Sequence, residues 1–362
     1  MSALEGFERS GRAPGVRNHV LVLPSVICSH EVAERIAAAV PGARAAPHDH
    51  GCAQIGADNE QTRRTFLGVA ANPNVAGAVV VGLGCEAVQS DGVADAIDDL
   101  GVPVRELSIQ GVGGTDECIE AGIATAEELA DHARETRRRP VDLGDLTLGI
   151  VSGDLRDTTV ERADPLVGDL ARAVEDAGGR VVAAGIERLV PHREAALGSA
   201  DGAGNLAAVL EDHADRPARA SRVGRAAAER EFADVTRAWG GLPIRDVLAY
   251  GERADHDGGL AVLDAPSRFE EAATGLVAAG AQVIVHATAE GVPTGHPIAP
   301  VLKVSGDPAT VEALGPDIDV DATSSGSEDL RERVESVVAG APTRAEEHGL
   351  TSFAITRVGP SM

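Results

Sequence analysis

The stretch Val75–Cys85, VAGAVVVGLGC, decides the fold of this chain. Its continuous apolar run is typical of a strand buried on both faces of a parallel sheet. Glycines end the run and indicate a turn, and segment 91–101 then predicts a short helix. A buried strand that leads into a helix is the repeating unit of an α/β fold.

The same alternation recurs along the chain. Further strands are expected over 19–28, 102–115, 146–154, 180–186 and 281–291, and helices over 31–40, 115–138, 165–178 and 328–339. The strand at 102–115 is expected to run into a glycine-rich turn, with Thr115 or Asp116 as the N-cap of the next helix. The segment 205–238, rich in Ala, Arg and Glu, is expected to be helical and largely at the surface.

A charge run with a proline and a glycine, RRRPVDLGDL at 137–146, predicts a boundary between two units. We expect a first α/β domain at 1–140, a second at 141–340 and a C-terminal tail at 341–362. Ligands of open parallel sheets bind beyond the carboxyl ends of the strands. The sequence therefore predicts two Rossmann-like, parallel-sheet α/β units packed around a shared cleft.

Composition excludes several classes of function. The 362 residues carry a net charge of −25, from 57 acidic and 32 basic residues, which argues against nucleic acid and anionic membranes as partners. No signal peptide opens the sequence and no apolar run reaches the length of a membrane span, so a soluble, cytoplasmic protein is expected. The four cysteines, at 28, 52, 85 and 118, form no CxxC pair.

Arginine replaces lysine almost everywhere, and Lys303 is the one lysine of the chain. Acidic excess with few lysines is typical of a halophile's cytoplasm, so most charges are expected to serve solvation. Lys303 stands among prolines and apolar residues, which predicts partial burial. An ammonium group changes its pKa more readily than a guanidinium does. The alternatives for Lys303 are a role in catalysis or an ion pair between the two units.

The segment His48–Gly56, HDHGCAQIG, concentrates side chains that can bind a metal. It resembles part of the altronate/galactarate dehydratase family, together with four other ordered motifs. These are GRAPGVRN (11–18), NPNVAGAVVVGLGCE (72–86), IQGVGGT (109–115) and GVPTGHPIAPVLKVSG (291–306), and the similarity reaches to about residue 325.

The resemblance implies a hydro-lyase that converts a sugar acid such as altronate or galactarate to a 2-keto-3-deoxy acid, with Fe²⁺ or Mn²⁺ as cofactor. It implies an oligomer and a separately encoded small SAF-domain subunit, because this sequence opens directly on the large part. The large (beta) subunit of sulfolactate sulfo-lyase is the nearest alternative, and a non-catalytic paralogue is a third. Two segments depart from the family pattern, Ser152–Asp157 and Ala287–Gly291. Glu290 stands where the family has an arginine that could hold a carboxylate.

Elimination of water from a sugar acid needs an α-proton base, a general acid and stabilisation of the enediolate. We expect His50, Lys303 and Glu86 to carry the catalysis. The expected metal ligands are His50, Cys52, Cys85 and Glu86, with His48 a weaker candidate and an iron–sulfur cluster on three thiolates as an alternative. The expected substrate-binding residues are Arg17, Asn18, Gln54, Asn59, Gln110, Gly113, Gly114, Thr115, Thr294 and His296. The competing interpretation of each residue is a structural role. Such a residue would form hydrogen bonds within a loop, cap a helix, allow a turn as a glycine does, or fill the core as a small buried thiol.

Overall fold

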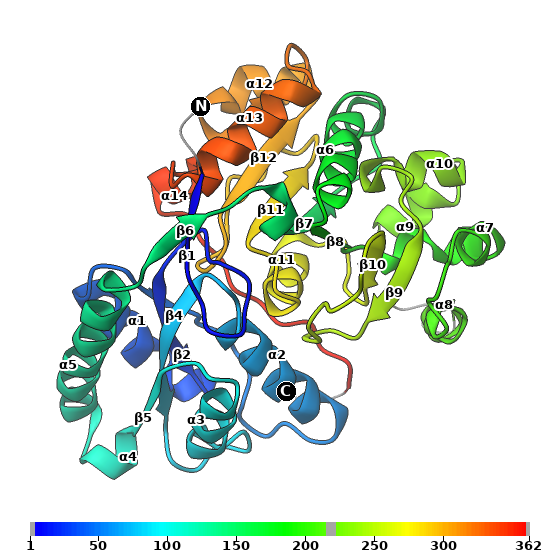
Figure 1. Cartoon of the computed structure of the whole chain (residues 1–362). Coiled ribbons are helices and arrows are strands. Elements are labelled where there is room, and N and C mark those ends of the chain that lie inside the picture. Colours follow the sequence, from blue (N-terminus) through cyan, green and yellow to red (C-terminus); the bar gives the residue numbers. More distant parts are fainter. Residues whose placement is uncertain (1–3, 215–221, 360–362) are drawn as a thin grey trace.

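The computed structural model describes residues 4–214 and 222–359, which fold as two α/β units, each around a parallel sheet (Figure 1). The predicted fold class is confirmed. In the first unit the strand order is β3-β2-β4-β5. The bounds are His19–Pro24 for β2, Ala43–Ala45 for β3, Val75–Gly82 for β4 and Val104–Ser108 for β5.

Side chains of β2 alternate between two cores. Val20 and Val22 pack under α1 (His30–Ala39) and α5 (Thr115–Arg134). Leu21 and Leu23 face the opposite side, under α2 (Ala57–Ala70) and α3 (Ser90–Asp99). With both faces covered, apolar residues are buried at every position of the strand after His19, which explains the continuous runs in the sequence.

The second unit holds the larger sheet, in the order β13-β12-β11-β7-β8-β10-β9. The bounds are Thr147–Ser152 for β7, Arg180–Ala183 for β8, Ile244–Leu248 for β9, Leu260–Leu263 for β10, Val283–Ala287 for β11, Val301–Ser305 for β12 and Val320–Asp321 for β13. Helices α6 (Asp164–Asp176) and α13 (Ser327–Val338) cover one face, and α11 (Phe269–Ala278) covers the other.

Both sheets have a point where the chain changes direction. In the first sheet β3 and β4 lie on opposite sides of β2, and in the second sheet β8 and β11 lie on opposite sides of β7. Crossover helices then lie on opposite faces, so a crevice opens between the carboxyl ends of the two diverging strands. Ser25 and Glu86 stand at this crevice in the first unit, and Gly153 and His286 in the second.

The units are joined by packing of α2 against α11. Gly68 in α2 allows this approach, because a Cβ there would lie 2.7 Å from the carbonyl oxygen of Ala278. A short antiparallel pair, β1 (Glu5–Phe7) with β6 (Arg138–Pro140), closes the junction. The C-terminal segment runs between α11 and α2 (Figure 1), where Phe353 and Ile355 are buried in a core shared by both units.

Some local expectations were wrong. The glycine-rich turn near 109–114 begins with a one-turn helix, α4 (Ile109–Val112), and the N-cap of α5 is Gly114 rather than Thr115 or Asp116. Gly114 has φ +145°, a conformation that favours glycine. The other helices are α7 (Arg193–Gly198), α8 (Leu206–Ala214), α9 (Arg222–Ala227), α10 (Phe232–Val235), α12 (Pro308–Leu314) and α14 (Arg344–His348).

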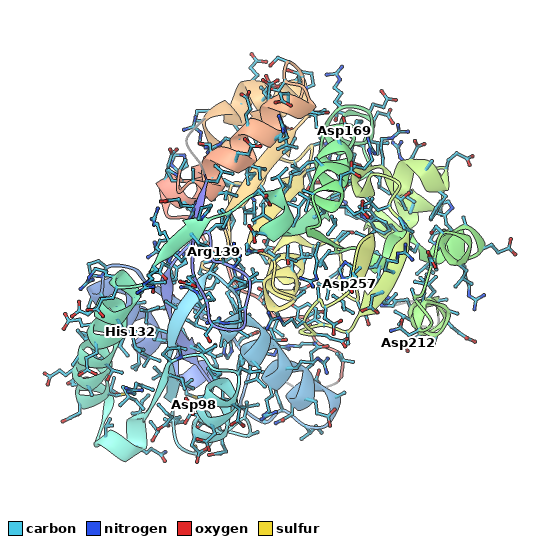
Figure 2. All side chains as sticks on the ribbon, viewed as in Figure 1. Asp98, His132, Arg139, Asp169, Asp212 and Asp257 are labelled. Carbon is cyan, nitrogen blue, oxygen red and sulfur yellow. The ribbon has the colours of Figure 1, made fainter. Side chains whose placement is uncertain are left out.

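The segment 205–238 forms α8, α9 and α10, and part of it, 215–221, lies outside the described residues. It is less exposed than expected, because Leu206, Leu210 and Ala227 are fully buried. Acidic side chains are spread over both units: Figure 2 marks Asp98 on α3, Asp169 on α6, Asp212 on α8 and Asp257 after β9. Within the described ranges, no helix combines the length and apolar character that a bilayer crossing requires.

Candidate active site

Two adjoining cavities lie beside the second sheet, and the larger of them is lined by residues of both units. The larger, of about 810 Å³, is bounded by α2, by the start of α11 and by the C-terminal segment 354–358. The smaller, of about 550 Å³, lies over the carboxyl ends of β7, β10 and β11. Glu187, Pro266 and Arg268 line both cavities, so the two cavities adjoin each other. Both volumes are in the range of small-molecule sites.

Among the site residues predicted from the sequence, His50 lines the larger cavity. Its Nδ1 accepts a hydrogen bond from the Gln54 amide at 2.7 Å, so the ring proton is on Nε2, 3.1 Å from the carbonyl oxygen of Ile355. Burial lowers the pKa of His50, against the opposing charge of Asp49. His50 is therefore neutral near pH 7, with both ring nitrogens engaged by protein groups.

Gly51 allows the histidine loop to lie against the end of β2, because a Cβ there would lie 2.1 Å from the carbonyl oxygen of Ser25. The loop also reaches the end of β4, where the amide of Ala87 donates to the carbonyl oxygen of Gly51. Nearby, both ring nitrogens of His48 are engaged by backbone groups. Its Nε2 lies 2.7 Å from the carbonyl oxygen of Pro24, and its Nδ1 accepts a hydrogen bond from the amide of His50.

Glu86 lies at the crevice of the first sheet, and both oxygens of its carboxylate accept hydrogen bonds. Its carboxylate accepts from the Ser25 hydroxyl at 2.8 Å and from the amides of Gly84 and Cys85 at 2.6 and 2.9 Å. Burial raises the pKa of this carboxyl, but these hydrogen bonds outweigh it, and the pKa is lowered overall. An ionised carboxylate with this many donors organises the loop after β4.

The structure brings several other predicted residues to this edge of the first sheet. Gln110 lies beside Cys85, with Nε2 4.0 Å from the sulfur, and Asn59 approaches the carbonyl oxygen of Ala87 at 3.4 Å. Cys52 and Cys85 are exposed, as is Cys28, whereas Cys118 is buried in α5. Gly113, Gly114 and Thr115 stand at the start of α5, outside both cavities.

The donor set expected for a metal does not fit one in this arrangement. Within residues 4–214 and 222–359, no three His, Cys, Asp or Glu side chains are grouped to hold a metal ion. Nδ1 of His50 and both carboxylate oxygens of Glu86 already accept hydrogen bonds from protein groups.

Arg17 and Asn18 lie away from both cavities. The Arg17 guanidinium forms a two-pronged ion pair with Glu346, 2.8 Å at each contact, and also donates to the carbonyl oxygens of Val337 and Ala341. Asn18 accepts from Arg9 and donates to the carbonyl oxygen of Ala133. Arg17 thus ties the first unit to the C-terminal segment through α14.

Lys303 is fully buried, more than the partial burial that the sequence predicts, and lies directly behind the smaller cavity. It faces His286 across the β11–β12 register, with Nζ 3.3 Å from Nδ1 of that histidine. Nζ also donates to the carbonyl oxygen of Thr294 and lies 3.8 Å from the ring centre of Phe269. Burial lowers the pKa of Lys303 to about 7, against the charges of Asp319 and Glu270.

His286 forms part of the cavity wall in front of Lys303. Its ring stacks on Phe269 with centroids 4.6 Å apart, and a Cβ on Gly153 would lie 2.8 Å from Nε2. Burial, and then the charge of Lys303, lower the pKa of His286 well below its ordinary value. Since the ammonium of Lys303 can only donate, Nδ1 accepts and the ring proton is on Nε2, at the cavity.

His296 and Thr294 lie in the loop that precedes β12, the strand of Lys303, but line neither cavity. His296 is buried against Phe353, its Nδ1 accepts from the amide of Ile298, and its Nε2 lies 3.4 Å from the Thr274 hydroxyl. Burial lowers its pKa to about 3. Thr294 contributes its backbone carbonyl to Lys303.

Asp154 joins the two diverging strands of the second sheet. One oxygen accepts from the Thr288 hydroxyl and the Ala289 amide, at 3.0 and 2.7 Å, and the other from the Thr159 hydroxyl and the Arg156 amide. These bonds hold the end of β7 against the end of β11. The loops that carry the smaller cavity are therefore fixed by a buried carboxylate.

Glu290, which reverses the charge expected at its position, gathers arginines at the same cavity. Its carboxylate pairs with Arg222 at 2.6 Å and with Arg156 at 3.6 Å, and both arginines line the cavity. Two guanidiniums from other elements therefore lie beside Glu290. A third, Arg268, stands where the two cavities meet. The cavity keeps positive groups that can bind a carboxylate.

The sequence reasoning missed His286, Asp154 and the arginine pair. His286 lies inside an apolar strand, VIVHA, and an ionisable residue within a buried strand was the available signal. No signal in the sequence pointed to Arg222, because α9 packs over the cavity only in the folded chain. The predicted residues fall in three places: the first crevice, the Arg17 junction and the wall behind the smaller cavity.

Two parallel-sheet units with a polar hollow at the carboxyl ends of their strands define a protein of the class that binds and transforms small molecules. The chain belongs to the altronate/galactarate dehydratase family. Residues 6–134 match the second domain of D-galactarate dehydratase/altronate hydrolase, and residues 235–361 match the C-terminal domain of D-galactarate/altronate dehydratase. Residues 135–234 lie outside both matches, and the divergent segment at Ser152 falls within them.

Curated relatives carry two names. The altronate dehydratase of Bacillus subtilis strain 168 is 28% identical over 357 residues, which cover 91% of this chain and 70% of that protein. The (2R)-sulfolactate sulfo-lyase subunit beta of Chromohalobacter salexigens is 28% identical over 383 residues, 98% of this chain and 97% of that protein. The altronate dehydratase of Escherichia coli K12 is 25% identical over 83% of this chain and 65% of its own length.

Proposed function

We propose that this chain is the large subunit of a hydro-lyase that dehydrates a sugar acid, such as altronate or galactarate, to a 2-keto-3-deoxy acid. The proposal depends above all on the Lys303–His286 pair at the wall of the smaller cavity. A buried amine behind an imidazole at a small-molecule cavity is an arrangement suited to proton transfer. The family of the chain supplies the class of substrate.

Binding begins with the substrate carboxylate. Arg156, Arg222 and Arg268 present guanidiniums to the smaller cavity, and a carboxylate takes two parallel hydrogen bonds from such a group. The acid then lies over the ends of β7 and β11, within reach of His286. The aromatic face of Phe269 and the carboxylate of Asp154 keep this wall in place.

Proton transfer follows from the tautomer of His286. Nε2–H donates its proton to the leaving hydroxyl group, and the ammonium of Lys303 passes a proton to Nδ1 in the same movement. The substrate loses its α-proton to a base and its hydroxyl group as water. Afterwards the base releases its proton to solvent, Nε2 of His286 takes up a proton at the cavity, and Nδ1 returns its proton to Lys303. His50 lies in the adjoining cavity, and its role as the α-proton base stays a prediction, as do the roles of Glu86 and Cys52.

The divalent ion, Fe²⁺ or Mn²⁺, and a small SAF-domain partner also stay predictions. Metal analysis of anaerobically purified protein, beside the His50→Ala variant, tests the first. If the wild type binds no metal under any condition, the metal assignment is wrong. Co-purification with a small SAF-domain protein tests the second, and full activity of the lone chain would contradict it.

A carbon–sulfur lyase acting on sulfolactate is the second candidate, favoured by the near-complete alignment with a sulfo-lyase beta subunit. It would share the loss of the α-proton and expel sulfite instead of water. The test incubates the chain, its small partner and Fe²⁺ or Mn²⁺ with altronate, galactarate and sulfolactate. Formation of a keto acid from a sugar acid supports the dehydratase, and release of sulfite supports the sulfo-lyase. If neither product forms, both proposals are contradicted.

A further inference from the structure

A third cavity, of about 380 Å³, lies at the opposite edge of the second sheet from the candidate active site. Thr147 and Arg180, the first residues of β7 and β8, line it, whereas the active-site cavity lies beyond the other ends of these strands. Arg12 from the first unit and Arg253 from the loop after β9 complete the set of polar residues. The volume is sufficient for a small ligand.

Three arginine side chains line this cavity, and no carboxylate of the described residues lines it with them. Among the described residues, neither Asp nor Glu lines this cavity, and Arg12, Arg180 and Arg253 form no ion pair in that part of the chain. Other arginines of this strongly acidic chain do pair, Arg139 with Asp145 and Arg333 with Asp319 among them. Gathering like charges is unfavourable unless a counter-charge is supplied.

Backbone carbonyl groups hold two of the three guanidiniums in place. Nη1 of Arg12 donates to the carbonyl oxygens of Ala71 and Asn72, each at 3.2 Å, at the C-terminal end of α2. Its Nε is buried and has no hydrogen-bond partner among residues 4–214 and 222–359. Nε of Arg180 donates to the carbonyl oxygen of His256 at 3.0 Å. Burial and then the charge of Arg253 lower the pKa of Arg12 to about 10, which leaves it charged at neutral pH.

We propose that this cavity binds a multivalent oxyanion, a phosphate group or a small polycarboxylate. Planar guanidiniums match the geometry of phosphate and carboxylate oxygens, and fixed guanidiniums lose little freedom on binding. An anion here would contact Arg12 of the first unit and Arg180 and Arg253 of the second, so it would join the units across their junction. The site is separate from the catalysis proposed above and does not depend on it.

Calorimetry and thermal unfolding of the whole protein test this site, with sodium phosphate and citrate as probes and chloride at the same ionic strength as reference. Arg253→Gln and Arg180→Gln each remove one lining guanidinium. Arg193→Gln is the matched control, because Arg193 is exposed on α7, lines none of the three cavities, and its loss changes the net charge by the same amount.

We expect one anion to bind per chain and to raise the unfolding temperature above that in chloride. Affinity falls by about tenfold or more in Arg253→Gln and Arg180→Gln, since each loses charge-assisted hydrogen bonds, and is unchanged in Arg193→Gln. Binding of phosphate alone assigns the site to a phosphate group, and binding of citrate alone to a polycarboxylate. The proposal is overturned if neither probe exceeds chloride, or if Arg253→Gln binds as tightly as Arg193→Gln.

Discussion

Lys303 and His286 face each other across two neighbouring parallel strands, with the amine nitrogen 3.3 Å from Nδ1 of the imidazole. The one lysine of the chain is thereby held behind a residue of the cavity wall, with Phe269 closing the space beside both. The lysine donates to the inner ring nitrogen, so the outer one carries a proton toward the ligand space.

Replacement of His286 by glutamine should lower kcat by about 10²-fold or more, because a general acid contributes on that order. His296→Gln is the matched control: His296 is equally buried but lines neither active-site cavity, so its loss should leave kcat within a few-fold. Steady-state assays on whichever acid proves to be the substrate measure both. Equal losses in the two variants would show that His286 acts only through folding.

Stability should depend on pH through Lys303. The folded chain releases this proton near pH 7 and the unfolded chain near its ordinary value of 10.5, so the unfolded state binds more protons between these limits. The free energy of unfolding of the wild type, relative to Lys303→Met, should therefore rise with pH over that window, by at most about 1.4 kcal/mol per unit. Urea unfolding at pH 7, 8 and 9 checks this; parallel profiles would refute it.

The protein should lose stability in mild acid. Burial lowers the pKa of His19 to about 3, of His48 to about 4 and of His296 to about 3, from 6.5 when unfolded. Unfolding takes up these three protons as the pH falls from 6.5 to 4. Asp164, whose pKa burial raises to about 7, opposes them with one proton.

These four groups leave a balance of two protons, which corresponds to about 2.7 kcal/mol of lost unfolding free energy per pH unit. His286, whose pKa burial also lowers, adds to this loss. Denaturant unfolding at pH 7, 6 and 5 measures the slope. His296→Gln should make it shallower by about 1.4 kcal/mol per unit. A profile that is flat between pH 7 and 5 would mean that these imidazoles are hydrated in the folded protein.

Arg17 should prove to be a residue of the junction between units. Arg17→Ala breaks the two-pronged pair with Glu346 and should cost about 2 kcal/mol of unfolding free energy, with KM unchanged. Glu346→Ala and the double variant complete a cycle whose coupling energy isolates the pair. A large rise in KM for Arg17→Ala, with stability intact, would restore the role in substrate binding that the sequence suggests.

The sequence by itself determined the parallel-sheet units, because burial on both faces leaves a continuous apolar run that is visible locally, as in β4. It also pointed to the unusual character of Lys303, from composition alone. Local pattern even placed the turn that leads to Glu86, which follows the end of β4.

Tertiary structure alone decided which of these residues meet. His286 faces Lys303 through strand register, Arg222 reaches Glu290 through the packing of α9, and Arg17 joins Glu346 from the other end of the chain. Such pairings link residues far apart in sequence, so no local periodicity encodes them. They follow from the order of the strands in each sheet and from the close packing of α2 on α11. Because Gly68 has no Cβ, the two helices can come into close contact there.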